Sequence, residues 1–276
     1  MAKGRYSAGM TQLSRPTVPP PFGDQLRTWR RQRRVSQLDL ALEIEMSQRH
    51  LSFIESGRTR PSRALVIRLA EGLDVPLRDR NQMLLAAGYA PVYGERALDD
   101  PALASARAAI ELILTGHAPF PALAVDQRWT LISANRALAP FLALVADKSL
   151  LAPPINVLRL SLHPQGLAPH ILNLGEWAAH LLDRLRRQIA TRADADLKTL
   201  LSELTGLCPL DASPRGPDYG GVLVPLRLQT PVGPLALFST TTVFGTPTDI
   251  TLSELMLEAF YPADAETDAR LRQWVG

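Results

Sequence analysis

Residues 36–62 read SQLDLALEIEMSQRHLSFIESGRTRPS, and this stretch predicts two short helices joined by a tight turn. The first helix spans residues 37–44 and carries mostly apolar side chains. Ser47 stands at an N-cap position, where its hydroxyl accepts a hydrogen bond from a free amide of the next turn. Leu51 and Ile54 form the inward i, i+3 pair of the second helix. Gly57 ends that helix at a position that favours positive φ.

The second helix leaves Gln48, Arg49 and Ser52 facing outward near its start. This arrangement resembles the helix-turn-helix of phage-repressor-like (Xre-type) regulators. The resemblance implies that the second helix enters the major groove of double-stranded DNA. The sequence departs from the family at Glu45, because the family usually has Gly in this turn. A left-handed conformation at Glu45 costs about 1–2 kcal/mol.

The surrounding sequence completes a small helical bundle. Residues 22–34 predict a helix before the stretch, Ser62 caps a further helix after Pro61, and residues 77–87 predict a fifth helix closed by Gly88. We therefore expect a flexible tail at residues 1–21 and an all-α five-helix DNA-binding domain at residues 22–91.

The charge distribution agrees with this division. Residues 1–90 contain 15 Lys and Arg against 8 Asp and Glu, a net charge of +7, whereas the remainder contains 15 against 19, a net charge of −4. A basic domain joined to a mildly acidic one indicates that only the first meets a polyanion.

The expected DNA contacts fall into two groups. Gln48, Arg49 and Ser52 are expected to read base edges. The other expected DNA-binding residues flank the second helix, and the amide of Gln37 donates to a phosphate in related proteins; these residues are Arg31, Arg34, Gln37, Ser47, Arg58 and Arg60.

Residues 92–115 are interpreted as a linker with an apolar helix at 101–114, which either joins the domains or pairs with a second subunit. From residue 116 to 276 the pattern predicts an α+β domain with an antiparallel five-stranded sheet and helices over one face, a PAS-like layout. Strands are expected at 121–126, 129–133, 222–229, 235–243 and 252–261, and helices at 135–142, 156–162, 174–191 and 194–206.

Three segments of this second domain resemble the ligand-binding domain of MmyB-like regulators: PALAVDQRWTLISAN, NVLRLSLHPQGLAPHILN and FSTTTVFGTPTDITLSEL with the later FYPAD. Together with the helix-turn-helix, the resemblance spans residues 22–264. It implies a bacterial transcription regulator whose second domain holds a fatty-acid-like molecule.

Arg159 and His163 are the candidates for binding a ligand's polar end. They lie four residues apart in a helix otherwise rich in Leu and Val, and an Arg on an apolar helix needs a carboxylate or a polar ligand. Asn135 and Asn173 are further candidate donors. The alternatives are that Arg159 pairs with Asp126 and that Asn135 is only an N-cap. Apolar lining is expected from Leu158, Leu160, Leu162, Ile171, Leu172, Trp177, Leu181 and Leu182.

Catalysis is not expected. Cys208, the single cysteine, follows Leu207 and precedes Pro209, which is typical of a small buried apolar residue, and it fits a reducing cytoplasm. The histidines lack metal-ligand spacing, and no glycine-rich phosphate loop is present. No metal or cofactor is expected apart from a bound fatty acid or similar amphipathic ligand. No apolar run reaches the 18–20 residues of a membrane span.

Three functions remain open at this point. The first is a cytoplasmic, nucleoid-associated DNA-binding regulator, acting as a homodimer and responding to a small molecule. The second is a regulator whose second domain serves only dimerisation or protein recruitment. The third is a hydrolase fused to a helical domain.

Overall fold

The computed structural model describes residues 20–191, 194–207, 224–245 and 247–276. The chain divides into two compact units between Val92 and Tyr93. Each unit has its own hydrophobic core. The expected N-terminal tail, Cys208 and the first two residues of the strand expected at 222–229 lie outside the described residues, apart from Pro20 and Pro21 of the tail.

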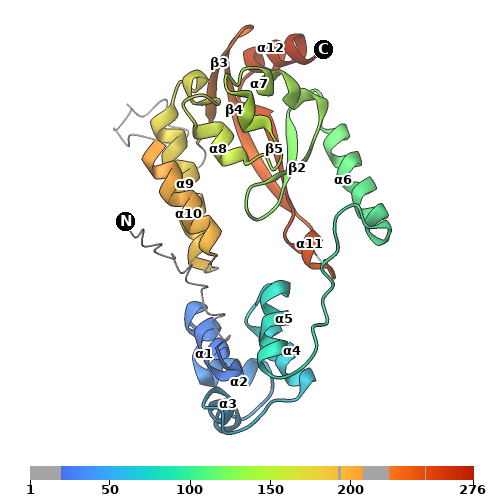
Figure 1. Cartoon of the computed structure of the whole chain (residues 1–276), viewed down its shortest axis with the longest axis vertical. Helices are drawn as coiled ribbons and strands as arrows, with labels where there is room; N and C mark the ends of the chain where they lie inside the picture. Colours follow the sequence, from blue (N-terminus) through green and yellow to red (C-terminus); the bar gives the residue numbers. More distant parts are fainter. Residues whose placement is uncertain (1–19, 192–193, 208–223, 246) are drawn as a thin grey trace, which may run out of the picture. The chain divides into compact units, whose positions relative to one another are not determined.

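The first unit is the predicted all-α bundle of five helices (Figure 1). Ser36, Ser47 and Ser62 cap three of them, and each hydroxyl accepts a hydrogen bond from the amide three residues later. The caps explain why the second, third and fourth helices begin where they do. The five are α1 (Phe22–Gln32), α2 (Gln37–Glu43), α3 (Gln48–Glu55), α4 (Arg63–Gly72) and α5 (Leu77–Ala86).

The turn between α2 and α3 has the left-handed conformation that was considered for Glu45 from the sequence. Glu45 has φ of +54° and is exposed, so a non-glycine residue occupies the position where Gly is usual. Ile44 precedes Glu45, and its carbonyl accepts a hydrogen bond from the guanidinium of Arg68 on α4. Contacts of this kind offset the cost of the left-handed residue. Gly57 and Gly88, with φ of +73° and +82°, end α3 and α5 as predicted.

A buried carboxylate joins the first three helices. Glu55 at the end of α3 is only 3% exposed. Its oxygens accept hydrogen bonds from Nε and Nη2 of Arg30 at 2.6 and 3.0 Å and from Nε2 of Gln37 at 2.7 Å. Burial by itself raises the pKa of the Glu55 carboxyl, but the hydrogen bonds from Arg30 and Gln37 outweigh it and hold this pKa below its usual range. Arg30 comes from α1 and Gln37 from α2.

The helices α1 and α3 also approach closely at Gly23. A Cβ atom there would lie 2.5 Å from the carbonyl oxygen of Glu55, so only Gly fits at this crossing. Arg30 belongs to a basic run with Arg31, Arg33 and Arg34, and its side chain turns inward to Glu55. Arg33 of the same run donates to the carbonyls of Leu73 and Asp74.

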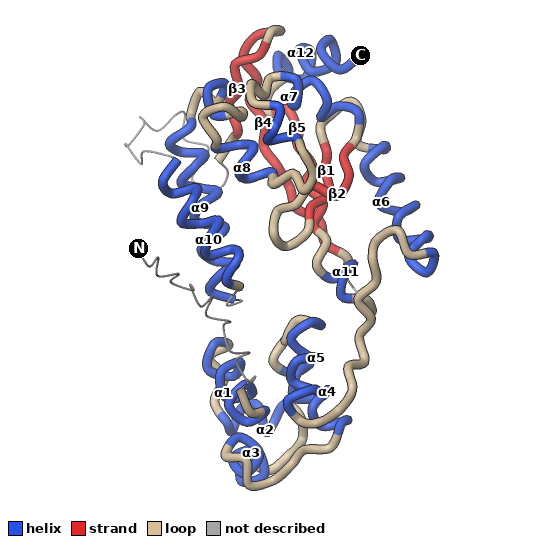
Figure 2. The backbone as a smooth tube through the Cα atoms, viewed as in Figure 1, coloured by secondary structure: helices blue, strands red, loops and turns tan. Residues whose placement is uncertain are grey.

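The second unit contains the predicted five-stranded antiparallel sheet, with strand order β2-β1-β5-β4-β3 (Figure 2). The strand expected at residues 252–261 has a displaced start. Residues 250–253 form the short helix α11, which Asp249 caps, so β5 begins later than predicted. The strands are β1 (Ala122–Val125), β2 (Leu131–Ala134), β3 (Leu226–Thr230), β4 (Gly233–Val243) and β5 (Met256–Pro262).

The expected helices of this unit are present, and α9 has the predicted bounds. Helix α12 at the C-terminal end was missed, although Asp264 provides a cap that accepts from the Thr267 amide. The helices are η1 (Pro101–Leu103), α6 (Ala104–Gly116), η2 (Arg136–Leu138), α7 (Ala139–Ala143), η3 (Lys148–Leu151), α8 (Val157–Leu162), η4 (Ala168–His170), α9 (Leu174–Thr191), α10 (Ala195–Leu207), α11 (Ile250–Ser253) and α12 (Ala265–Val275).

The two faces of the sheet are covered by different helices. Leu123 of β1 and Leu237 of β4 pack with α8 and α9, and α10 lies against α9 (Figure 1). On the opposite face, Ile110 and Leu114 of α6 pack on β1. The expectation of helices over one face was therefore incomplete, because the apolar helix assigned to the linker belongs to the second unit. Leu172, expected to face the interior, is 59% exposed.

We expect Arg30→Met to lower the free energy of unfolding of the first domain by about 3 kcal/mol, because removing one side of a buried ion pair leaves the other charge without its partner. Arg31→Met is the matched control: Arg31 is exposed on the same helix, and its loss should change stability by less than about 0.5 kcal/mol. Hydrogen exchange of the α1–α3 amides in the full chain measures both. Equal effects of the two substitutions would contradict the role given to Glu55.

Candidate nucleic-acid surface and ligand cavity

The outer face of α3 is polar because its inner face supplies Leu51 and Ile54 to the core. The Ser47 hydroxyl accepts from the His50 amide at 3.2 Å, which satisfies one free donor at the start of the helix. Gln48 and Arg49 are exposed, as predicted, whereas Ser52, which was also expected to face outward, is half-buried. The first turn of α3 therefore presents hydrogen-bonding side chains to solvent.

Phe53 links two of the predicted basic residues. The guanidinium carbon of Arg49 lies 5.3 Å from the centre of the Phe53 ring, and that of Arg58 lies 5.7 Å from it. Both distances are within the range of cation–π attraction. Arg58 follows α3 in sequence, so the ring brings a residue of the next loop to the α3 surface. Phe53 was not singled out from the sequence, because a half-buried aromatic residue in a helix is usually read as core.

Arg31 and Arg34 lie at the end of α1 and are exposed, as expected of phosphate-binding residues. Arg34 has φ of +57°. Arg30 and Arg33, which are close to them in sequence, are held by contacts within the domain. Of the four arginines in this basic run, Arg30 and Arg33 therefore contact other parts of the domain, although Arg33 is also exposed.

Two other predicted DNA contacts have partners inside the domain. Gln37 donates through Nε2 to Glu55. Arg60 donates to the carbonyls of Ala87 and Gly88 at 3.0 and 3.3 Å, and its guanidinium lies 5.3 Å from the centre of the Tyr89 ring. Arg60 therefore holds the end of α5, which the sequence could not indicate because the contact spans 27 residues.

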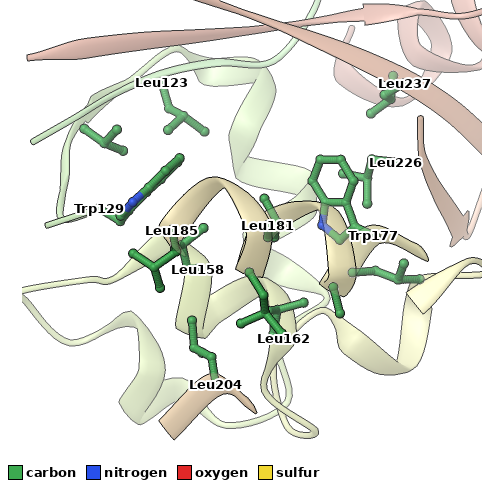
Figure 3. Packing of buried hydrophobic residues seen from close by; sticks show 14 of the residues in the cluster. Leu123, Trp129, Leu158, Leu162, Trp177, Leu181, Leu185, Leu204, Leu226 and Leu237 are labelled. Carbon is green, nitrogen blue, oxygen red and sulfur yellow. The ribbon is translucent and has the colours of Figure 1, made fainter. Parts of the chain in front are cut away.

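The second unit encloses a cavity of about 100 Å³ between the sheet and the helices. One water needs about 10–15 Å³ of such space, so the cavity has room for a group of several heavy atoms. Figure 3 shows some of the apolar side chains around it, including Trp129, Trp177 and Leu181. The lining residues are Pro121, Leu123, Trp129, Leu131, Leu138, Phe141, Leu142, Val157, Leu158, Leu160, Ser161, Leu167, Trp177, Leu181, Arg184, Leu226, Leu228, Leu237, Ser239, Glu258 and Phe260.

An ion pair forms the most polar part of this lining. Nη2 of Arg184 on α9 donates to Oε1 of Glu258 on β5 and, at 2.8 Å, to the hydroxyl of Thr241 on β4. The Thr241 hydroxyl also donates to Oε1 of Glu258, at 2.9 Å. The guanidinium carbon of Arg184 lies 4.5 Å from the centre of the Trp129 ring. The sequence offered one sign of this site, since Glu258 lies two residues from both Met256 and Phe260 and therefore shares their inward-facing side of the strand.

Arg159, the predicted head-group residue, does not line the cavity that the structure describes. Its Nε and Nη2 atoms donate to both carboxylate oxygens of Glu203 on α10, at 2.6 and 2.7 Å. These hydrogen bonds raise the pKa of Arg159 and lower the pKa of Glu203. Arg159 does pair with a carboxylate, but its partner is Glu203 rather than Asp126.

His163 is also absent from that lining. Helix α8 ends at Leu162, and His163 has an extended backbone with ψ of 138°. The His163 amide still donates to the carbonyl of Arg159 at 2.9 Å, so the two residues keep the expected i, i+4 relation along the backbone. The ring of His163 accepts through Nδ1 from the Gln165 amide at 3.1 Å.

The two predicted asparagines connect elements of the fold instead of facing the described cavity. Asn135 donates to the carbonyls of Leu114 and Phe120 and accepts from the Ala122 amide, which ties β1 to the end of α6. Asn135 occupies the N-cap position of η2, but its side chain makes no capping hydrogen bond there. Asn173 accepts from the amide of Arg227 in β3 at 3.1 Å. Both side chains are buried.

Comparison with known families places these sites in context. Residues 106–273 match the MmyB-like transcription regulator ligand binding domain, and residues 21–83 match a helix-turn-helix domain. The chain belongs to the MmyB-like transcription regulators. The matches cover α1 to most of α5 in the first unit and nearly all of the second. This membership confirms a transcriptional regulator with a DNA-binding and a ligand-binding domain.

No curated protein matches this MmyB-like chain. In the part of the chain that the structure describes, no helix has the length and apolar character needed to cross a membrane. No three His, Cys, Asp or Glu side chains cluster as a metal site among the described residues.

Proposed function

We propose that this protein is a cytoplasmic, nucleoid-associated regulator that binds specific double-stranded DNA through α3 and an amphipathic small molecule through its second domain. The observation that carries the DNA-binding part is the exposed polar face of α3. Arg49 and Arg58 both contact the Phe53 ring at this face. Its helix-turn-helix is of the phage-repressor-like (Xre) type in this proposal. The function requires no catalytic group, and none is proposed.

The DNA contacts divide into base readers and phosphate binders. Gln48, Arg49 and Ser52 project from the first two turns of α3, the part of a recognition helix that contacts base edges. Phosphate contacts come from exposed basic residues and the start of α3; this group consists of Arg31, Arg34, Arg58 and Ser47. Gln37 and Arg60 are left out because they already hold other parts of the domain.

Arg49→Ala is expected to cost about 1–3 kcal/mol in binding to the preferred site while leaving random DNA nearly unaffected. Arg31→Ala should instead weaken binding to all sequences alike and reduce the salt dependence. Sequencing the DNA fragments that the protein retains gives the preferred site, and fluorescence anisotropy at several salt concentrations gives the affinities. Arg136→Ala, an exposed charge in the second domain, is the control. Equal losses from Arg49→Ala on preferred and random DNA would contradict base reading.

The ligand is an amphipathic molecule, such as a fatty acid or an uncharged derivative of one, whose apolar chain occupies the cavity. The support is the lining, in which Leu, Val, Phe and Trp side chains predominate. Burial of an alkyl chain contributes about 0.8 kcal/mol per CH₂ group. The alternative, a second domain that serves only dimerisation or protein recruitment, requires the cavity to remain without a small-molecule ligand.

Fatty acids and the matching alcohols of increasing chain length should raise the melting temperature of delipidated protein. A ligand at 100 times its Kd stabilises the folded state by about 2.7 kcal/mol. Leu142→Trp, which fills part of the cavity, should abolish the increase, whereas Leu172→Trp at an exposed position should not. Native mass spectrometry of the freshly purified protein should also detect a bound molecule. The absence of any shift across the series would favour the alternative.

The regulator acts as a homodimer. One helix-turn-helix covers a half-site, so tight selection requires two copies about one helical turn apart. The outer face of α6 is available for the contact: Leu112 is 75% exposed and Ile113 is 46% exposed. Large exposed apolar side chains side by side favour an interface over free solvent.

Light scattering at micromolar concentration should give the mass of a dimer, and Leu112→Lys should shift it toward the monomer by placing a charge in the contact. Leu38→Lys, at an exposed position of α2, is the control for an added charge elsewhere. A monomer both free and on DNA would rule out the dimer. A dimer unaffected by Leu112→Lys would place the contact away from α6.

A further inference from the structure

The cavity of the second domain has few groups that can meet a ligand's polar end. Apart from the indole nitrogens of two tryptophans, the polar side chains in its described lining are those of Ser161, Arg184, Ser239 and Glu258. Arg184 is the one cation among them and Glu258 the one anion. The chemistry of these four residues decides which head group the cavity accepts.

The charge of Arg184 is already compensated. Its Nη2 atom donates to Glu258 and Thr241, and its guanidinium lies over Trp129. The Glu258 side chain is only 6% exposed. A carboxylate ligand would have to compete with Glu258 for Arg184. It would either leave the Glu258 charge buried without its cation or place two carboxylates on one guanidinium, and both arrangements are strongly unfavourable.

The two serines, by contrast, have hydrogen-bonding capacity to spare. The Ser161 hydroxyl accepts from Nε1 of Trp177 at 3.0 Å, so its own hydrogen remains available to donate. Among the described residues, no side-chain hydrogen bond engages the Ser239 hydroxyl. Ser239 pairs with Phe260 across β4 and β5, which places it on the same sheet face as Thr241 and Glu258. One hydroxyl therefore comes from α8 and the other from the sheet.

We propose that the cavity selects an amphipathic ligand with an uncharged, hydrogen-bonding head group, such as an alcohol, ester or amide, in preference to a carboxylate. The two serine hydroxyls bind the head group, and the Arg184–Glu258 pair excludes an anion. This inference rests on the proposed function, because it requires that the second domain bind a small molecule.

The test compares compounds that share one alkyl chain and differ in the head group: the carboxylic acid, the alcohol, the methyl ester and the primary amide. Isothermal titration of the delipidated full chain at neutral pH gives the Kd of each. We expect the three uncharged compounds to bind at least about tenfold more tightly than the acid. Ser239→Ala should weaken the alcohol about two- to tenfold, the effect of one neutral hydrogen bond.

Glu258→Gln provides the sharper comparison. The amide oxygen can still accept from Arg184 and Thr241, but the negative charge is gone, so the acid should gain about tenfold or more relative to the alcohol. Glu203→Gln is the matched control, because it removes the carboxylate from Arg159, which does not line the described cavity. The acid-to-alcohol ratio of Kd values should not change there. Comparing this ratio between variants cancels the different solubilities of the two compounds.

The outcomes separate this inference from the proposed function. Equal or tighter binding of the acid by wild-type protein would overturn the head-group preference while ligand binding stands. An acid-to-alcohol ratio that changes in Glu203→Gln and not in Glu258→Gln would place the head group at Arg159 and also overturn it. No binding of any compound would refute the proposed small-molecule function. If circular dichroism shows that Glu258→Gln is unfolded, the wild-type series and Ser239→Ala decide the question.

Discussion

A buried carboxylate must find a cation and hydrogen-bond donors, and in the first domain this requirement determines how the helices meet. Glu55 receives Arg30 from α1 and Gln37 from α2, so the end of α3 is held to both other helices. The close approach at Gly23 brings the backbones of α1 and α3 together at the same place. The orientation of α3, and with it the direction of its polar face, depends on this junction.

The second domain meets the same requirement at Glu258, with a different result. Its arginine partner comes from α9, and the pair borders a cavity instead of closing a core. A charged pair next to an apolar space carries a dipole but no net charge. It therefore gives the space a polar boundary without making it a site for anions. The fold thus uses one kind of contact for rigidity in one domain and for selectivity in the other.

Local signals explain how much could be predicted from the sequence. Ser47, Ser62, Gly57 and Gly88 act through hydrogen bonds or backbone angles within a few residues, and each was placed correctly. Helix α9 was bounded correctly because its amphipathic period is long and regular. The strand predicted from residue 252 began too early, since the cap at Asp249 favours a helical turn over an apolar strand.

The candidate site was predicted less well, because ion pairs connect distant residues. Arg159 pairs with Glu203 and Arg184 with Glu258, and neither partner is near in sequence. The sequence correctly indicated that Arg159 needs a carboxylate, but the choice between a protein group and a ligand depends on how α8 packs on α10. The surface residues of α3 were identified because helical periodicity alone places them.

The contact of the Phe53 ring with two arginines has a consequence for how recognition can change during evolution. A long arginine side chain loses up to about 2 kcal/mol of rotamer freedom when it is fixed, and contact with the ring removes part of that freedom before DNA arrives. The ring has no preference for any base. New target sequences can therefore arise by substitution at the neighbouring positions of α3, while the aromatic support that keeps binding tight is retained.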